Sequence, residues 1–430
     1  MTIMTDAELL LGLSRHLSVF QMGPEKAALE QLEFAGRVLD MAFRLRGSTT
    51  SSAERLSAIG LDAGLGRTML QPVIATMETL GWINVTRDTY SAPIAVAESI
   101  PAPGDLVASA SSLLDMLRAT PQERAALSIL RATSLQPLLV DDALQMATTS
   151  ACDEATGEDA IRHLTYLKLV RRVKTEADDR EVLYNPNVWT QGDSIAQAAL
   201  KAADARATRE VAALLEEVSA NPGMPEAHVK STDSKWVTFA VSQGLVQRSV
   251  IQTSEDAEQG FLFTPHLTRG PFSGTAGDAS GQVRQLVGSM IYASTFAAYR
   301  LRSPAVFLRA LIDRGVAGNA TSIGTDYLML EKAGVVKVIQ GSGLGYCQLE
   351  LLQSEVAEDA LQLLIAREGT GVSNASSADI AALRAQRSYI HVESDRAKMA
   401  LTADVDEIEQ ARLLAALRDV PIRRMMSGRS

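Results

Sequence analysis

Cysteine is almost absent from this 430-residue chain, which contains only Cys152 and Cys347. Two thiols are too few for a disulfide framework or for a metal site built from several cysteines, and they are typical of a reducing compartment. We therefore expect a cytoplasmic protein without structural disulfides.

Long hydrophobic runs are also missing. No window reaches the roughly 18 uncharged apolar residues that a membrane-spanning helix needs. The short apolar run near the N-terminus follows the acidic Asp6, which is unlike an export signal. We expect a protein that is neither exported nor embedded in a membrane.

The chain has no excess of positive charge. It contains 41 Lys and Arg residues against 51 Asp and Glu residues, which gives a net charge of -10. This balance excludes a basic protein that coats nucleic acid or anionic membrane indiscriminately. Any nucleic-acid contact must use local groups of basic side chains.

Recognisable catalytic motifs are absent. The histidines show no metal-ligand spacing with one another or with cysteines; they are His16, His163, His228, His266 and His391. The glycine-rich segment 341–346 has Tyr346 where a dinucleotide-binding loop needs its third glycine, and an alternating, strand-like run follows it. We expect a hairpin tip there, and no enzyme, cofactor or metal.

A pattern that occurs four times stands out against these absences. In each occurrence an amphipathic helix ends and a β-rich stretch begins directly, at 78–85, 165–173, 242–250 and 331–339. Gly81, Gly244 and Gly334 occupy the junction in three of them, and Lys168 occupies it in the other. Glycine is favoured there because the residue after a helix often adopts a left-handed conformation.

A second extended run follows each junction, after a polar tip. In three occurrences it ends near an aromatic residue and a proline, and in the fourth it is the alternating segment 347–351. Two or three helical segments precede each junction. The unit therefore reads helix, helix, helix, strand, tip, strand, which is a helical motif closed by a β-hairpin.

This order and size resemble the winged-helix superfamily, in which the third helix of a helix-turn-helix enters the major groove and the hairpin lies over the adjacent backbone. The resemblance implies a mainly α protein with short β-hairpins and four tandem winged-helix units. We expect these parts: a helical N-terminus with unit 1 at 1–97, unit 2 at 103–192, unit 3 at 196–269, unit 4 at 283–368, and a helical C-terminal tail at 380–430.

Unit 2 carries the most specific likeness, because its hairpin resembles the wing of MarR-type proteins with their Asp-x-Arg tip. Asp178 and Arg180 match that tip. The resemblance implies that Arg180 reaches a minor groove while Asp178 holds its guanidinium group. The third helix of unit 2 departs from the pattern, because its first half is acidic between Asp153 and Asp159.

Basic residues on the expected reading elements predict double-stranded DNA as the partner. The candidate DNA-binding residues are Arg44, Arg46, Arg55, Arg67, Arg87, Arg162, Arg171, Arg172, Lys174, Arg180 and Lys235. Most lie in units 1 and 2, whereas the hairpin of unit 3 is acidic. We expect a DNA-binding transcriptional regulator or architectural factor. The alternative is a protein-protein scaffold of a chromosome-organising or replication-type assembly, with protein partners on units 3 and 4.

The tail adds an expectation about assembly. Asp404 and Glu407 form a capping pair at the start of a helix whose apolar residues make one broad face, namely Val405, Ile408, Leu413, Leu417 and Val420. Such a face needs a partner surface, which is either the body of the same chain or a second subunit. The second is preferred, so a homo-oligomer is expected. The end of the chain is basic, with five arginines from residue 412 onward.

Overall fold

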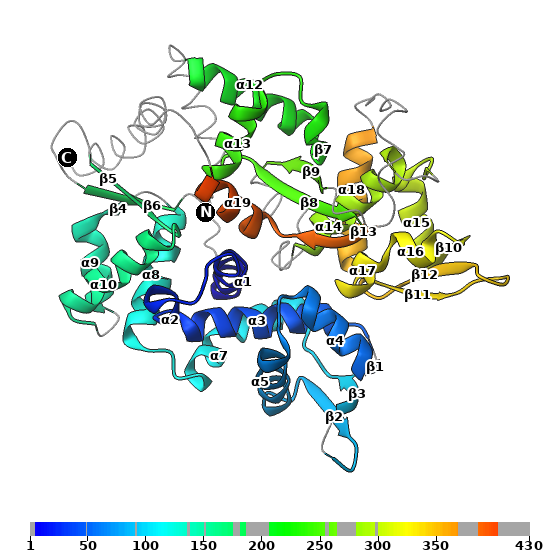
Figure 1. Ribbon diagram of the computed structural model, residues 1–430, viewed down its shortest axis with the longest axis horizontal. Coiled ribbons are helices and arrows are strands. Elements are labelled where there is room, and N and C mark those ends of the chain that lie inside the picture. Colours follow the sequence, from blue (N-terminus) through cyan, green and yellow to red (C-terminus); the bar gives the residue numbers. More distant parts are fainter. Residues whose placement is uncertain are drawn as a thin grey trace.

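The computed structural model describes residues 5–48, 50–90, 93–135, 138–149, 152–174, 181–185, 206–253, 258–264, 281–296, 300–368 and 386–402. In these residues the protein is mainly helical and contains small antiparallel sheets of three or four strands (Figure 1). The expected class, mainly α with short β-hairpins, is confirmed at this level.

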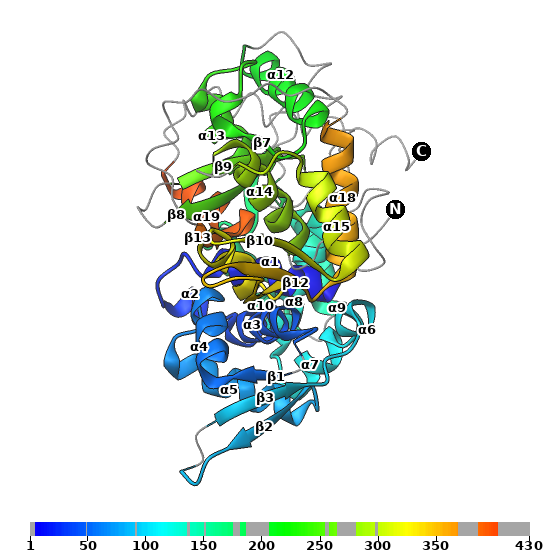
Figure 2. The ribbon, with the colours of Figure 1, turned by 90° about the vertical axis from the view of Figure 1, so that its right-hand side faces the viewer.

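The region of unit 1 is organised around one three-stranded sheet. Its elements are α3 (Glu30–Leu45), β1 (Thr50–Ser52), α4 (Ala53–Asp62), α5 (Arg67–Thr79), β2 (Ile83–Arg87) and β3 (Pro93–Glu98). The strand order is β1-β3-β2, so the last strand is central. Ser52 begins α4, because its hydroxyl accepts a hydrogen bond from the Arg55 amide at 3.3 Å. The β2–β3 hairpin projects from the body (Figure 2).

The same order of elements recurs three times. Unit 2 contains α8 (Pro121–Leu135), β4 (Leu138–Leu139), α9 (Val140–Thr149), α10 (Glu154–Tyr166), β5 (Arg171–Lys174) and β6 (Glu181–Tyr184). Unit 3 contains α12 (Arg206–Ala220), β7 (Met224–Pro225), the 3-10 turn η1 (Glu226–His228), α13 (Ser234–Ser242), β8 (Gln247–Thr253) and β9 (Glu258–Phe263). Unit 4 contains α15 (Pro304–Arg314), β10 (Val316–Ala320), α16 (Ile323–Asp326), α17 (Leu328–Lys332), β11 (Val336–Gln340) and β12 (Cys347–Leu351).

Each sheet places the strand after the first helix beside the last strand of the hairpin, as in β4-β6-β5 and β10-β12-β11. The sequence did not predict these first strands. They are as short as two residues in β4 and β7, too short to show an alternating pattern.

The four helix-to-strand junctions adopt the expected left-handed backbone. Gly81, Gly244 and Gly334 have φ angles of 71°, 73° and 73°, and Lys168 has a φ of 58°. This conformation is sterically unfavourable for lysine, which has a Cβ atom, but not for glycine. The sequence pattern therefore located all four helix ends.

The helix α1 (Asp6–Leu17) binds several parts of the chain together. It starts with a capping box between Thr5 and Glu8, and it packs against α3, α8 and α19 (Val392–Thr402). A side chain at Gly36 would overlap the backbone carbonyl of Leu10, so α1 and α3 are in very close contact. Buried apolar residues continue without a break from α1 through units 1 and 2.

The remaining helices connect or cover the units. They are α2 (Pro24–Ala27), α6 (Pro103–Ala108), α7 (Ala110–Met116), α14 (Gln282–Thr295) and α18 (Ser354–Glu368). α14 and α18 join residues of β8 and β9 to the core of unit 4. None of the described helices combines the length and apolar character needed to cross a bilayer.

The first described part of the expected helical tail is a strand instead. β13 (Gln386–Ile390) pairs antiparallel with β8 and extends the sheet of unit 3 to β13-β8-β9-β7. The reason is that β8 otherwise presents an open edge, and pairing satisfies its backbone groups. α19 follows, and the rest of the predicted tail, including Asp404 to Val420, lies outside the described residues.

Two glycines at equivalent helix-to-strand junctions, Gly81 and Gly334, test the packing of unit 4 against the end of α3. At Gly334 a Cβ atom would overlap the carbonyl oxygen of Arg44, whereas at Gly81 it would meet nothing within 4 Å. Gly81→Ala should cost about 1 kcal/mol of unfolding free energy from backbone strain, and Gly334→Ala should cost about 3 kcal/mol because overlap adds to the strain. Urea denaturation followed by circular dichroism measures both. Equal losses would contradict the close contact between Gly334 and α3.

Candidate functional site

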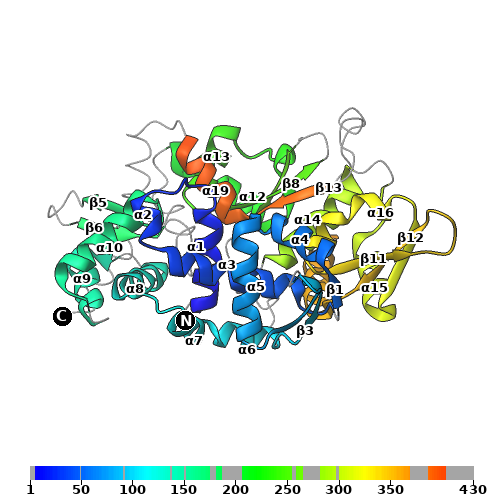
Figure 3. The same cartoon turned by 60° about the horizontal axis from the view of Figure 1, so that its bottom comes forward.

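The third helix of unit 1 keeps one face open to solvent. Among the described side chains of α5, the exposed ones are uncharged: Thr68, Gln71, Pro72, Ala75 and Thr79. Its opposite face is apolar and buried on α3 and β2. Figures 1 and 3 show α5 on the outside of the molecule, with the β2–β3 hairpin beside it. At the hairpin tip Tyr90 is 90% exposed.

The corresponding helix of unit 2 is open but acidic. Glu154 and Glu158 are exposed on α10, together with Arg162 and Tyr166. The Arg162 side chain is 68% exposed and pairs with Asp159 at 2.8 Å. This surface repels phosphate over its first two turns.

Units 3 and 4 use their third helices inside the protein. α13 packs against α12 and α19, and most of its residues from Trp236 onward are buried. α17 packs against α4 and β13, where Glu331 lies 3.8 Å from Arg55 and Lys332 lies 3.9 Å from Asp62. Neither helix presents its face to a groove.

Three of the candidate DNA-binding residues lie in internal contacts. Arg44 is 4% exposed and is bonded to Asp40 and Asp62, so a duplex cannot reach it. Arg46 donates to the Gln353 side chain at 3.1 Å and pairs with Glu355, and Arg55 pairs with Glu331. Arg46 and Arg55 therefore attach unit 1 to unit 4. The reason is that a guanidinium group suits buried or interfacial pairs as well as phosphate.

The other candidates whose side chains are described are divided among units 1, 2 and 3. Arg87 pairs with Glu78, Arg172 pairs with Glu181, and the exposed Lys235 lies 4.8 Å from the ring of Trp236. Arg171 is half-buried on β5. Arg67 is the first residue of α5, and Lys174 is the last of β5. Arg180 and Asp178 lie outside the described residues. The candidates whose side chains are described do not form one patch.

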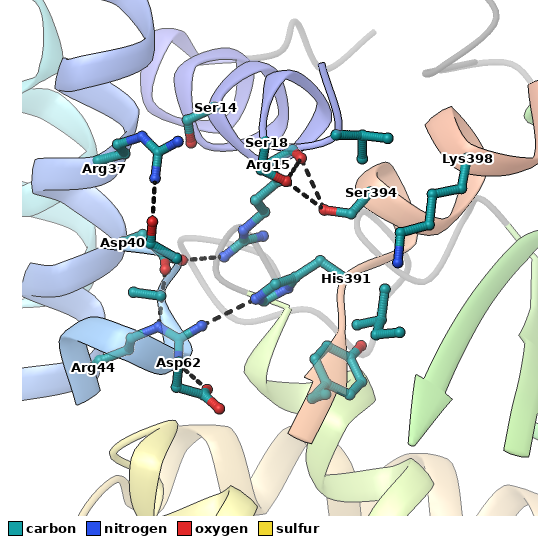
Figure 4. A pocket seen from close by; sticks show the side chains of 15 residues that line it. Ser14, Arg15, Ser18, Arg37, Asp40, Arg44, Asp62, His391, Ser394 and Lys398 are labelled. Atoms are coloured by element: carbon teal, nitrogen blue, oxygen red, sulfur yellow. Dashed lines mark hydrogen bonds and ion pairs between the residues drawn. The ribbon is translucent and has the colours of Figure 1, made fainter. Parts of the chain in front are cut away.

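A polar pocket that the sequence did not reveal lies between the N-terminal helices and the C-terminal strand and helix. Its volume is about 280 Å³. Its charged and polar lining residues are Ser14, Arg15, Ser18, Arg37, Asp40, Arg44, Asp62, His391, Ser394 and Lys398 (Figure 4). They come from α1, α3, the end of α4, and β13–α19. Distant segments of the chain thus meet at this pocket.

Asp40 is the centre of the ion pairs along one wall of the pocket. Its carboxylate accepts from Arg15 at 2.6 Å and from Arg44 at 2.8 Å, and Arg44 also donates to Asp62 at 2.7 Å. Burial alone would raise the pKa of Asp40, but the Arg44 and Arg15 guanidinium groups hold that pKa well below its usual range. Asp40 therefore stays ionised.

His391 is neutral in this network. Its Nε2 atom lies 3.1 Å from a nitrogen of Arg44, and a guanidinium group can only donate, so Nε2 accepts. Burial lowers the pKa of His391 well below its ordinary value, and the nearby Arg15 and Arg44 charges lower it further. His391 therefore acts as a hydrogen-bond acceptor for Arg44 in this network.

The described residues hold no cluster of His, Cys, Asp and Glu that could bind a metal ion. The two carboxylates of the pocket, Asp40 and Asp62, are bonded to arginines. Carboxylates held in this way are poorly suited to proton transfer. The sequence analysis did not identify the pocket residues, because they are far apart in the sequence. One local signal was present: Asp40 and Arg44 have the i, i+4 spacing of an ion pair on one helix.

Comparison with known proteins matches the chain to no family model and to no curated protein. Functional inference therefore rests on the chemistry and geometry of the chain itself.

The Asp40 network predicts a pH-dependent stability. Because its folded-state pKa lies below the unfolded value, Asp40 stabilises the protein above pH about 4, and this contribution is lost as the pH falls below that value. Asp40→Asn should lower the unfolding free energy by about 3 kcal/mol at pH 7, and the difference from the wild type should narrow at pH 3. Urea unfolding at both pH values measures it.

Glu78→Gln is the control for this prediction, because it removes an ion pair whose side chains are 35% and 39% exposed. It should change stability little at either pH. A loss for Asp40→Asn that is equally large at pH 3 would show that the carboxylate charge is not the stabilising feature.

Proposed function

We propose that the protein is a non-enzymatic DNA-binding factor, regulatory or architectural, built from four winged-helix units of which unit 1 contacts the duplex. The recurrent order of helix, strand, two helices and hairpin, with the first strand beside the last, supports this assignment. In such units the third helix reads the major groove and the hairpin touches the flanking backbone.

The observation that carries the proposal is the open, uncharged face of α5. Gln71 and Thr68 offer hydrogen-bond donors and acceptors that match base edges. Arg67 begins this helix, whose free amide groups also favour a phosphate. The hairpin adds Arg87 on the neighbouring strand. No acidic side chain lies among the fully exposed positions of α5.

The binding surface is therefore narrower than the sequence suggested. The acidic face of α10 disfavours DNA at unit 2, and α13 and α17 are covered. DNA affinity should be modest, because one unit supplies few phosphate contacts. Cytoplasmic location and a homo-oligomer remain expectations. The predicted tail helix on which the homo-oligomer depends lies outside the described residues.

The alternative is a protein scaffold, and one observation favours it. α13 and α17, the third helices of units 3 and 4, pack against other elements of the same chain. In two units the third helix therefore contacts protein. The net charge of -10 agrees with a protein partner. In this alternative the neutral face of α5 would receive a protein surface instead of a duplex.

A gel-shift assay with duplex DNA distinguishes the two functions. The wild type should bind at low salt and weaken steeply as salt is added, because phosphate contacts release counterions. The double variant Arg67→Glu/Arg87→Glu should lose most of this affinity on all sequences, because each reversal replaces attraction to phosphate by repulsion.

The double variant Arg162→Glu/Arg172→Glu is the matched control. It introduces the same change of charge on exposed residues of unit 2 and should bind nearly as well as the wild type. An equal loss in both variants would make the attraction a general charge effect. No duplex binding at any salt concentration would favour the scaffold.

A further inference from the structure

The open face of α5 carries a specific set of chemical groups. Thr68, Gln71, Pro72 and Ala75 are exposed at positions i, i+3, i+4 and i+7, so they form one stripe along the helix. We propose that α5 reads A·T base pairs through the major groove, with Gln71 bonded to adenine and with Pro72 and Ala75 against thymine methyl groups. This inference rests on the proposed function, because it requires α5 to lie in the groove of a duplex.

The side-chain amide of Gln71 is available to bond a base. Gln71 is exposed, and within the described part of the chain its side chain has no hydrogen-bond partner. The hydroxyl of Thr79, by contrast, donates to the Ala75 carbonyl at 2.9 Å. A glutamine amide holds a donor and an acceptor side by side, which matches the N6 donor and the N7 acceptor of adenine.

A G·C pair finds no equivalent partner in this stripe. Guanine presents two acceptors in the major groove, which arginine or lysine matches, and cytosine presents a donor that a carboxylate accepts. The four residues of the stripe include neither a basic nor an acidic side chain. Arg67 precedes the stripe at the first position of α5, where the proposed function assigns it to phosphate. The stripe therefore favours A·T over G·C.

Pro72 is unusual because it lies inside a helix and on its exposed face. Proline has no N–H group, so it removes one hydrogen bond from the helix, and burial of its ring does not offset that loss here. The exposed ring and the methyl group of Ala75 give the stripe an apolar part. Among the four bases only thymine presents a methyl group in the major groove, and apolar side chains contact it. A thymine contact accounts for Pro72, whereas packing within unit 1 does not.

The turn before α5 leaves the stripe accessible. Gly64 and Gly66 are exposed in this turn, and at Gly66 a Cβ atom would meet nothing within 4 Å. The buried side of α5 packs on α3 and β2, which fixes the direction of the stripe. The N-terminal residues of a reading helix are those that contact base edges, and Gln71 and Pro72 lie in the first two turns of α5.

Fluorescence anisotropy at low salt with three duplexes of one length and identical flanks tests the proposal. Their central pairs are A·T, G·C or inosine·C. The base of inosine is guanine without its 2-amino group, so inosine·C resembles G·C in the major groove and A·T in the minor groove. The full chain should bind the A·T duplex about tenfold more tightly than the G·C duplex, and the inosine·C duplex should behave like G·C.

Variants locate the reading residue. Gln71→Ala should weaken binding to the A·T duplex about tenfold and leave binding to the G·C duplex nearly unchanged, because it removes one pair of base contacts. Gln71→Arg should reverse the preference, because arginine matches guanine, and the ratio of the two affinities reports this separately from the added charge. Gln362→Ala, at an exposed glutamine of α18, is the matched control and should keep the wild-type ratio. Circular dichroism checks that each variant is folded.

Equal affinity for the A·T and G·C duplexes would overturn the base reading and leave the proposed DNA contact standing. An inosine·C duplex bound like A·T would assign the preference to the minor groove and so overturn the role of α5. An unchanged ratio in Gln71→Ala, or the same change in Gln362→Ala, would also overturn it. If no duplex binds at any salt concentration, the inference and the proposed function fail together, and a protein partner on α5 is favoured instead.

Discussion

The last turn of α3 is the constraint on which the rest of the structure depends. A helix that ends inside a protein must have its final carbonyl groups satisfied. The Phe43 carbonyl accepts from the side-chain amides of Gln282 at 3.3 Å and Gln353 at 3.1 Å, and Gly334 lies directly against the next carbonyl, that of Arg44. These contacts fix unit 4 onto unit 1.

The side chains of the same turn connect further segments. Arg44 reaches α4 through Asp62 and β13 through His391, while Asp40 links Arg44 to Arg15 on α1. A buried guanidinium group is tolerated only when such partners surround it. One arginine therefore helps to define the positions of four segments that are distant in the sequence.

This arrangement divides the four units into two classes. Units 3 and 4 turn their third helices inward, toward α19, α4 and β13, and so contribute to the body of the protein. Units 1 and 2 keep theirs open, and the two open faces differ in charge. The exposed residues described on α5 are uncharged, whereas the exposed face of α10 carries carboxylates that repel phosphate.

Burial explains why three of the arginines that were predicted to bind DNA form contacts within the chain instead. Arg44, Arg46 and Arg55 were assigned to the reading elements of unit 1, yet each contacts a carboxylate of another element. The hairpins and third helices of the four units are not equivalent once the units pack on one another. Which face stays open depends on that packing.

The sequence by itself determined part of the local structure. The repeat, the hairpins and the left-handed junctions at Gly81, Lys168, Gly244 and Gly334 follow from short-range patterns, because helix ends and strand alternation are set by neighbouring residues. It also located the basic residues, but it could not tell a phosphate-binding arginine from a buried one.

Tertiary structure alone decided the pairing of β13 with β8 and the inward faces of α13 and α17. It also decided the pocket that joins Arg15, Asp40 and His391. These features depend on contacts between residues up to several hundred positions apart, and no local pattern encodes such distances.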